Sequence, residues 1–454
     1  MVSTFALGYL LIAFEHKIQI NKAAVAVTLG MSLWVMYIYA GDSLIKGVNA
    51  EDFAHFLSIN PESPALPLAK QCIKFISESQ IIHYLGEHVQ IIFYLIGAMT
   101  IVELIDVHGG FSCITDRIKT RNKRKLLWIL SFFTFFMSAI LDNLTTSIVM
   151  IMVLRKLIRD NKERMIFASI VIIAANSGGA FSPIGDVTTI MLWIKGMITT
   201  GGVLAELFLP SLVSMVVPVF ILQFALKGKL NVGQNLPKDN VAVFTRRQRR
   251  TVFFLGVGGL IFVPIFRYLT ALPPFMGILL VLGLLWTVTE CFHRSTSEDD
   301  TMARRVSQLL ARIDMSTILF FLGILMAVAC LSEIGVLTAL GAALNDVSGG
   351  NHYLVTGAIG VISSIVDNVP LVAGCMGMYP IAPAGDMGVD GLFWLLLAYC
   401  AGVGGSMLII GSAAGVVVMG LEKITFGWYL KHVSWVALVG YLAGMVAYWL
   451  VQMI

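Results

Sequence analysis

Runs of apolar residues long enough to cross a membrane dominate the hydrophobicity pattern of this chain from one end to the other. A helix that spans the hydrocarbon core needs about 20 such residues. By that measure the pattern predicts five spanning helices in each half of the chain. It also contains the segments 126–154 and 353–384, each too long for one span and too short for two. We interpret both as re-entrant hairpins.

The charges beside these two segments predict the side from which each hairpin enters. Lys and Arg flank 126–154 on both sides, and because such residues mark the cytoplasmic side of a membrane, this hairpin should open to the cytoplasm. The flanks of 353–384 carry Asp346, Asp386 and Asp390 instead. The second hairpin should therefore open to the outside.

A basic loop at 227–250 divides the chain into the halves 1–226 and 251–454. The cluster of arginines at 246–250 is expected to anchor this loop in the cytoplasm, and an RNA-binding patch is the weaker alternative. With five spans on each side of a cytoplasmic loop, both termini are expected on the external, periplasmic side. Glu15, His16 and Lys17 would lie in the cytoplasm after a short first span.

Composition agrees with a multi-pass protein whose partner is the lipid bilayer. Hydrophobic residues make up 57% of the 454, charged residues only 13%, and the mean hydropathy is +0.85, values typical of all-α polytopic membrane proteins. The net charge of +4 reflects the basic loops, so we expect no nucleic-acid partner. The six cysteines are scattered without a CxxC motif, which favours packing roles over metal binding or disulfides.

Two of the predicted spans contain helix-disfavouring stretches. The span 165–198 is interrupted at 176–186, where Gly178, Gly179 and Pro183 disfavour a regular helix. The span 392–421 has a similar glycine-rich stretch. Irregular backbone is tolerated at membrane depth only where protein or a water-filled cavity covers it. We therefore predict two discontinuous helices, each made of two half-helices around an unwound middle.

The second half repeats the motifs of the first half in the same order and at a nearly constant offset along the sequence. The pair Asp142-Asn143 recurs at Asp367-Asn368, Gly178-Gly179 at Gly404-Gly405, and Ile184-Gly185 at Ile410-Gly411. Recurrence in order indicates an internal duplication. Because each half has an odd number of spans, the halves must cross the membrane in opposite directions. This inverted repeat is typical of secondary transporters, which bind substrate where broken helices meet.

Carboxylates are rare inside the predicted core segments. Asp142, Asp186 and Asp367 are the charged residues there, and each costs at least about 2.5 kcal/mol at the bilayer centre. They could simply cap half-helices, a role compatible with ion binding. Glu103, in the third span, and Asp106 near its end are candidates for a proton relay; the alternative for Glu103 is snorkelling or pairing with a nearby base.

Oxygen-bearing side chains gather at the hairpin tips and helix breaks, and oxygen is the ligand that a hard cation such as Na⁺ requires. The candidate cation and proton ligands are Asp142, Asn143, Thr145, Asn176, Ser177, Ser182, Asp186, Thr188, Asp367, Asn368, Ser364, Ser406 and Ser412. Asp186 of the first half corresponds to Ser412 of the second. The principal Na⁺ site is therefore expected in the first half, at Asp142, Asn143, Asn176 and Asp186.

A buried carboxyl group can couple a cation to a proton. Burial and a like-charged neighbour both make a carboxyl group hold its proton more tightly. Such a group holds either a proton or a metal cation at one time, but not both. This competition is sufficient for exchange, because protonation on one side releases the cation and the cation displaces the proton on the other.

The hairpin motif at 142–147, the stretch 176–189 and the motif at 367–370 resemble the NhaD-type sodium/proton antiporters of the ion transporter superfamily, over essentially the whole chain. The resemblance implies a bacterial inner-membrane antiporter that exports Na⁺ or Li⁺ in exchange for H⁺, supports pH homeostasis and needs no cofactor. It also implies an elevator-type fold shared with dicarboxylate carriers. Those relatives have Ser at both hairpin tips, where this chain has Asp142 and Asp367. The added negative charge should repel an anionic substrate.

Other functions and assemblies stay open. A sodium-coupled carboxylate or oxyanion carrier could use half-helix N-termini in place of a basic side chain. An intramembrane aspartyl protease would need two adjacent carboxyls, and Pro183 stands where its GxGD-like pattern needs Gly. We expect a transporter and not an enzyme. A homodimer is an alternative to a monomer.

Overall fold

The computed structural model describes residues 1–13, 18–110, 120, 122–158, 160–226, 228, 244–293, 306–311, 313–365 and 367–453. The regular elements among these residues are helices, and eight of them are long and apolar enough to cross a membrane. The protein is therefore an all-helical, multi-pass membrane protein. Most of the predicted loop 227–250, and the expected cytoplasmic residues Glu15, His16 and Lys17, lie outside the described residues.

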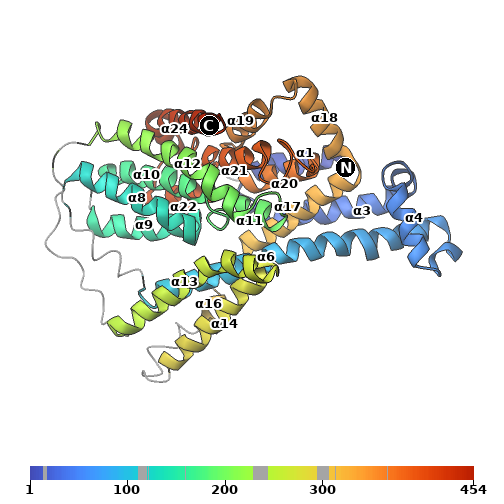
Figure 1. The fold of residues 1–454 in the computed structure, drawn as a ribbon, viewed down its shortest axis with the longest axis horizontal. Coiled ribbons are helices and arrows are strands. Elements are labelled where there is room, and N and C mark those ends of the chain that lie inside the picture. Colours follow the sequence, from blue (N-terminus) through green and yellow to red (C-terminus); the bar gives the residue numbers. More distant parts are fainter. Residues whose placement is uncertain are drawn as a thin grey trace. The chain divides into compact units, whose positions relative to one another are not determined.

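The chain packs as two compact units, each made of segments that are far apart in sequence (Figure 1). The first unit comprises 1–93, 314–351 and 369–380. Its elements are α1 (Val2–Ala13), α3 (Lys22–Val48), α4 (Ala50–Ile59), η1 (Ser63–Ala65), α5 (Leu68–Lys74), the π-helix η2 (Phe75–Gln80), α17 (Met315–Glu333), α18 (Val336–Ser348), the first part of α6 (Ile81–Val107) and α20 (Asn368–Met378) from Val369 on.

The second unit comprises 94–313, 352–368 and 381–454, within the described ranges. Its elements are the rest of α6, α8 (Lys123–Leu141), α9 (Asn143–Leu157), α10 (Asn161–Ala180), α11 (Val187–Ile194), α12 (Thr200–Leu222), α13 (Arg246–Thr270), α14 (Pro274–His293), α16 (Val306–Leu310), α19 (His352–Ser363), α21 (Leu392–Gly404), α22 (Ala413–Glu422), α23 (Phe426–Tyr429), η4 (Leu430–Ser434) and α24 (Trp435–Val451).

Helix α10 is the buried centre of the second unit. It packs against α8, α9 and α12 and against both α21 and α22. Every residue from Phe167 to Ala180 is buried. The outer helices are different, since α12 and α13 leave large apolar side chains exposed, as lipid-facing helices do; these are Leu204, Phe208, Leu209, Phe220, Phe254, Ile261, Phe262 and Ile265.

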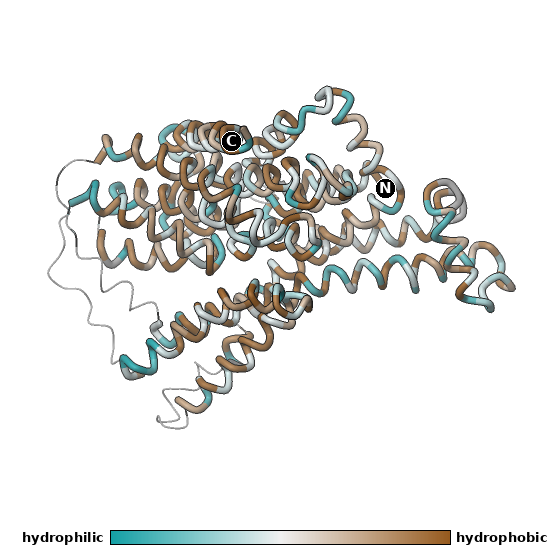
Figure 2. The backbone as a smooth tube through the Cα atoms, in the orientation of Figure 1, coloured by the Kyte–Doolittle hydropathy of each residue, from teal (hydrophilic) through white to brown (hydrophobic). Residues whose placement is uncertain are grey.

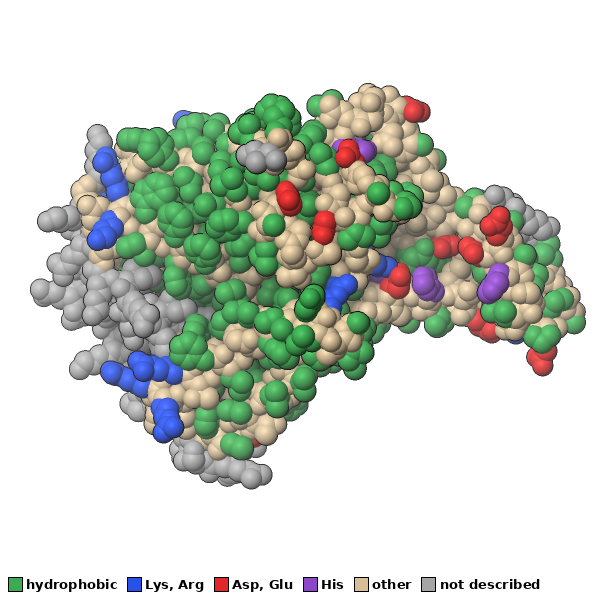
Figure 3. Space-filling view, viewed as in Figure 1, with side chains coloured by type: hydrophobic (Ala, Val, Ile, Leu, Met, Phe, Trp, Pro, Cys, Tyr) green, Lys and Arg blue, Asp and Glu red, His purple; other side chains and the backbone are tan. Residues whose placement is uncertain are grey.

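The outer surface of the second unit has an apolar middle and a basic end. Figure 2 shows the hydrophilic, arginine-rich start of α13 followed by a hydrophobic helix. In the space-filling view, hydrophobic side chains cover α12 and the body of α13, and Lys and Arg gather where α13 begins (Figure 3). This distribution suits a helix whose body lies in lipid and whose start lies at a membrane surface.

The helix break in 165–198 is shorter than the sequence predicts. The chain leaves helical geometry between Phe181 and Asp186, but Asn176–Ala180 belong to α10, so the predicted unwinding of these five residues was wrong. A side chain at Gly178 would collide with the carbonyl oxygen of Phe135 on α8. The glycine therefore permits close helix packing and does not interrupt the helix.

The third span also begins earlier than predicted. The apolar pattern of the sequence predicts the third span at 89–107, after an external connection that could include an interfacial helix around 68–85. In the structure, α5, η2 and α6 instead form one continuous apolar helical stretch over residues 68–107. The extra turns bring Gln80 and Tyr84 to the end of α17 within the first unit.

The helix pairs α8–α10 and α19–α21 pack through the same kinds of contact. In each pair a serine of the first helix donates to a backbone carbonyl of the second, and a glycine of the second lies against a carbonyl of the first. The serine bonds join Ser138 to Ala175 (2.5 Å) and Ser363 to Ala401 (2.8 Å); the glycine contacts join Gly178 to Phe135 and Gly404 to Gly360. Matching positions are separated by nearly the same offset as the repeated sequence motifs.

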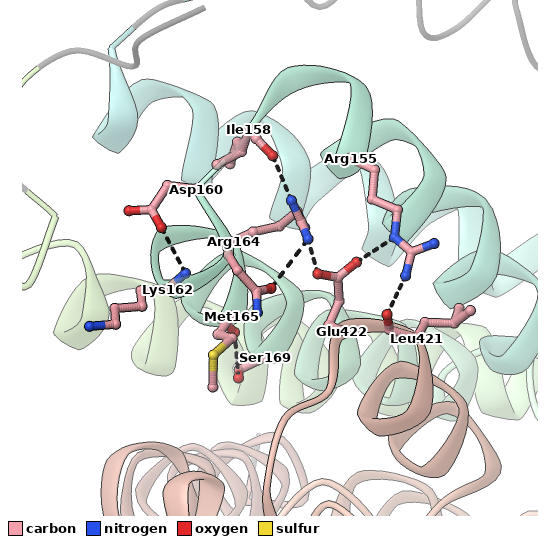
Figure 4. A network of polar contacts seen from close by, with 10 residues as sticks. Arg155, Ile158, Asp160, Lys162, Arg164, Met165, Ser169, Leu421 and Glu422 are labelled. Carbon is pink, nitrogen blue, oxygen red and sulfur yellow. Dashed lines mark hydrogen bonds and ion pairs between the residues drawn. The ribbon is translucent and has the colours of Figure 1, made fainter.

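A buried carboxylate at the end of α22 forms ion pairs with α9 and α10 (Figure 4). The side chain of Glu422, at the end of α22, is fully buried and pairs with Arg155 of α9 (2.8 Å) and Arg164 of α10. Arg155 also donates to the carbonyl of Leu421, and Arg164 to that of Ile158 (2.9 Å). The pairs join the base of the first hairpin to the second broken helix.

Candidate functional site

The tip of the first hairpin is a single strained residue between two helices. Helix α8 ends at Leu141 and α9 begins at Asn143, so Asp142 alone makes the turn. The Asp142 carboxylate accepts hydrogen bonds from the backbone N–H of Thr145 and from its hydroxyl group, both at 2.8 Å. Its backbone has φ 83° and ψ 159°, a region that is essentially reserved for glycine and costs about 1–3 kcal/mol.

The amide of Asn176 connects the first hairpin to the second broken helix. The side chain of Asn176 is fully buried, and its oxygen accepts from the Asn143 side-chain amide at 3.2 Å. Its nitrogen donates to the hydroxyl oxygens of Ser406 (2.9 Å) and Ser412 (3.0 Å). Four predicted site residues thus form one buried network that crosses between the two halves of the sequence.

The carboxylate of Asp186 connects the first broken helix to the Asp-Asn motif of the second half. Asp186 is 2% exposed, and it caps α11 by accepting from the N–H of Thr188 at 3.3 Å. Its second oxygen accepts from the Asn368 side-chain amide at 3.2 Å. An acid of the first half is therefore bound to the Asp-Asn motif of the second half.

Gly402 provides the room for the Asp186 carboxylate, and sequence reasoning did not single it out. A Cβ atom at Gly402 would lie 3.3 Å from an oxygen of Asp186 and 3.3 Å from the Cβ of Ala180. Asn176 and Ala180 are one helical turn apart on α10, so the carboxylate lies within about one turn of the Asn176 network. The sequence repeat could have identified Gly402, because Gly402 follows Asn176 by the same offset that relates Ser412 to Asp186.

The surroundings of Asp186 offer it little positive charge. Between residues 165 and 194 it is the only charged side chain, and 392–421 contains none. In the described structure the hydroxyl groups of Thr146, Ser147 and Thr188 are buried without a hydrogen-bond partner. Thr146 and Ser147 are on the first turns of α9 and Thr188 is on the first turn of α11, so the helix starts that Asp142 and Asp186 cap carry unused oxygen ligands.

Some predicted ligands are occupied elsewhere. The Ser177 hydroxyl accepts from that of Ser214 on α12 at 2.9 Å. Ser182 donates to the carbonyl of Ala139 at 2.5 Å, and Ser364 to that of Val361 at 2.7 Å. The first two hydroxyl groups join different helical segments and that of Ser364 bonds within its own helix end, so all three are weaker candidates for ion ligands in this conformation.

The structure also places the remaining candidates without assigning them a role. Asp367 directly precedes α20 and is half-buried. Glu103 and Asp106 are half-buried in the last two turns of α6. Their participation in cation binding or in a proton relay stays a prediction.

Comparison with known proteins assigns the family. The profile of the family described as "Citrate transporter" matches residues 9–396. The "Sodium/proton antiporter 1" of Arabidopsis thaliana is 44% identical over 99% of this chain and 71% of that protein, and the "Sodium/proton antiporter 2" of the same plant is 42% identical over 99% and 98%. The "Na(+)/H(+) antiporter NhaD" of Vibrio parahaemolyticus is 30% identical over 79% of this chain and 89% of its own length.

The chain belongs to the NhaD-type sodium/proton antiporter family. A second NhaD protein, from Vibrio cholerae, is 29% identical over 99% of this chain. The resemblance first seen in the hairpin and helix-break motifs is confirmed over the full length of the sequence. These plant and bacterial relatives carry the names of sodium/proton antiporters.

Proposed function

We propose that the protein exchanges Na⁺ or Li⁺ for H⁺ across a membrane, by competition of the cation and the proton for Asp186 and Asp142. One observation carries the proposal: the Asp186 carboxylate is buried beside the Asn176 network and accepts a hydrogen bond from the neutral amide of Asn368, and the segments 165–194 and 392–421 of the two broken helices contain no Lys, Arg or His. A buried carboxylate with neutral neighbours needs a proton or a cation to balance its charge.

The same residues offer a ligand set for a small hard cation. The carboxylate of Asp186, the hydroxyl oxygens of Ser406 and Ser412 and the buried hydroxyl group of Thr188 are all oxygen donors. When the cation leaves, a proton on Asp186 keeps the group neutral. The hydrogen bond from Asn368 can persist in both states because a carboxyl group retains an oxygen that accepts.

We also propose that the two halves of the sequence form an inverted repeat, with re-entrant hairpins at 126–154 and 353–384 and an elevator-type movement. The support is the set of matched serine and glycine contacts, whose positions are related by a nearly constant sequence offset. Asn143 and Asn368 are related by the same offset, and each donates its side-chain amide to a residue of the first broken helix. The halves proposed in this way are 1–226 and 251–454, joined by the basic loop 227–250.

We propose the membrane from the direction of the proton gradient, and the orientation from the basic residues at the helix starts. Export of Na⁺ driven by H⁺ requires a membrane across which protons are pumped outward, which in a bacterium is the inner membrane. The basic starts of α8 and α13 would face the cytoplasm, and both termini would lie outside.

A coupled carboxylate carrier is the second candidate, and the match to a family described as "Citrate transporter" favours it. Asp142 and Asp367 at the two tips argue against it, because both would repel an anionic substrate. Purified protein in proteoliposomes distinguishes the two functions. Antiport predicts that Na⁺ dissipates an imposed pH gradient without any organic anion, whereas the carrier would require a carboxylate for Na⁺ movement.

A further inference from the structure

The first unit contains a second carboxylate site that the exchange mechanism does not use. Glu333 is the last residue of α17 and is half-buried. One of its oxygens accepts from the Tyr84 hydroxyl at 2.8 Å; the other accepts from the side-chain amides of Asn49 (2.9 Å) and Gln80. Asn49 also donates to the hydroxyl oxygen of Tyr37 at 3.2 Å. Segments far apart in sequence thus converge on one acid.

These contacts leave the charge of Glu333 unbalanced. Among the described residues, no Lys, Arg or His lies within ion-pair distance of its carboxylate, and its side-chain partners are two neutral amides and one phenol. His83 acts on it only from beyond that distance, and its imidazole already lies 3.6 Å from Glu87. Its position adds to the negative potential, because the C-terminal end of a helix carries about half a negative charge. A carboxylate at that end of α17 is electrostatically unfavourable unless a positive charge is bound nearby.

An unused ligand atom points to what binds there. Gln80 is 6% exposed, and its side-chain oxygen has no hydrogen-bond partner in the part of the chain that the structure describes, although its nitrogen donates to Glu333. A buried amide oxygen without a partner costs about 1–3 kcal/mol. Gln80 is also the last residue of the π-helix η2, and single π turns inside longer helices occur frequently at functional sites.

We propose that Glu333, Gln80, Asn49 and Tyr37 form a second binding site for a monovalent cation such as Na⁺, separate from the exchange site. The ligands are hard oxygen atoms, which excludes soft transition metals. The site carries one negative charge, which one monovalent cation balances. Gln80 can present its oxygen to the cation while its nitrogen keeps its bond to the carboxylate, and the half-exposed Glu333 gives access from the surface.

Equilibrium binding of radioactive Na⁺ to the purified full-length protein tests this site. The variant Asp142→Asn/Asp186→Asn removes the proposed exchange ligands, and saturable Na⁺ binding is expected to remain. Adding Glu333→Gln, or separately Gln80→Leu, should abolish the remaining binding. Gln71→Leu is the matched control, because Gln71 is half-buried in the same unit and its side-chain amide donates to the nearby carbonyls of Pro64 and Leu66, away from Glu333.

The outcomes separate the two sites. Loss of all saturable binding in Asp142→Asn/Asp186→Asn would overturn the second site and leave the exchange site standing. Residual binding that persists at wild-type affinity in both Glu333→Gln and Gln80→Leu would also overturn it. Gln80→Leu retains the carboxylate, so it tests the site even if Glu333→Gln fails to fold. Monodisperse elution of each variant on size-exclusion chromatography shows that it is folded.

Discussion

The side-chain amide of Asn368 donates to the Asp186 carboxylate at 3.2 Å. The two residues are 182 positions apart and belong to opposite halves of the sequence. A neutral amide satisfies one oxygen of the acid without neutralising its charge. The bond therefore holds the carboxylate in place and leaves its charge to be balanced by a proton or a cation.

Asn368→Ala should impair cation affinity more than maximal rate. Loss of the amide leaves the buried Asp186 oxygen with one partner fewer, which costs about 1.5–3 kcal/mol for a bond to a charged group. The apparent KM for Na⁺ is expected to rise at least about tenfold, since each 1.4 kcal/mol corresponds to a factor of about ten. Vesicle assays of Na⁺-dependent pH-gradient dissipation measure this, with Asn351→Ala, outside the network, as the control. An unchanged KM would contradict the positioning role of Asn368.

Gly402→Ala should disturb the exchange site through packing alone. The new methyl group would lie 3.3 Å from an Asp186 oxygen and from the Cβ of Ala180, and overpacking costs about 1–3 kcal/mol. We expect the apparent KM for Na⁺ to rise about fivefold or more. Gly420→Ala is the matched control, because nothing lies within 4 Å of the added atom on α22. Equal effects of the two changes would count against the proposed contact.

Asp142→Gly and Asp142→Ala should separate the strain of the hairpin tip from its function. Both remove the carboxylate and its bonds to Thr145, but glycine adopts φ 83° freely whereas alanine does not. The glycine variant should be more stable to thermal unfolding by about 1–2 kcal/mol, within the usual cost of such strain. Exchange activity should be lost in both. Equal thermal stability of the Asp142→Ala and Asp142→Gly proteins would contradict a strained backbone at this turn.

Glu422→Ala should destabilise the second unit strongly. The change removes the carboxylate that pairs with Arg164, whose side chain is 15% exposed, and breaking a buried ion pair costs about 3–5 kcal/mol. Glu78→Ala is the control, since Glu78 is exposed and its pair with Lys74 at 3.9 Å should contribute no more than about 1 kcal/mol. Thermal unfolding of the purified variants provides the comparison. Similar melting temperatures for the two variants would contradict the role given to Glu422.

Much of the candidate site could be predicted from local sequence. A lone Asp in a long apolar run and its recurrence in the second half identified Asp142, Asp186 and Asn368. Helix continuity through Asn176 could not be predicted in this way, because glycine propensity disfavours a helix there and the packing of Gly178 against α8 overrides it. Local pattern identifies chemistry but not the neighbours that decide local structure.

Contacts between residues far apart in the chain could not be predicted from the sequence. The partners of Glu333 come from residues 49, 80 and 84, and those of Glu422 from residues 155 and 164. No periodicity or motif relates these positions, since they meet only when the helices pack. Gly402 is an intermediate case. The repeat offset identifies it as the counterpart of Asn176, but only the structure shows that its missing side chain leaves room for Asp186.

The central claim is that Asp186 carries the exchanged proton. Its most direct test is dissipation of an imposed pH gradient by Na⁺ in proteoliposomes that contain Asp186→Asn, with the exposed Asp346→Asn as control. An amide cannot alternate between a proton and a cation, so the account predicts a rate at least about tenfold below wild type for Asp186→Asn, with Asp346→Asn unchanged. Exchange at the wild-type rate in the Asp186→Asn protein would contradict it.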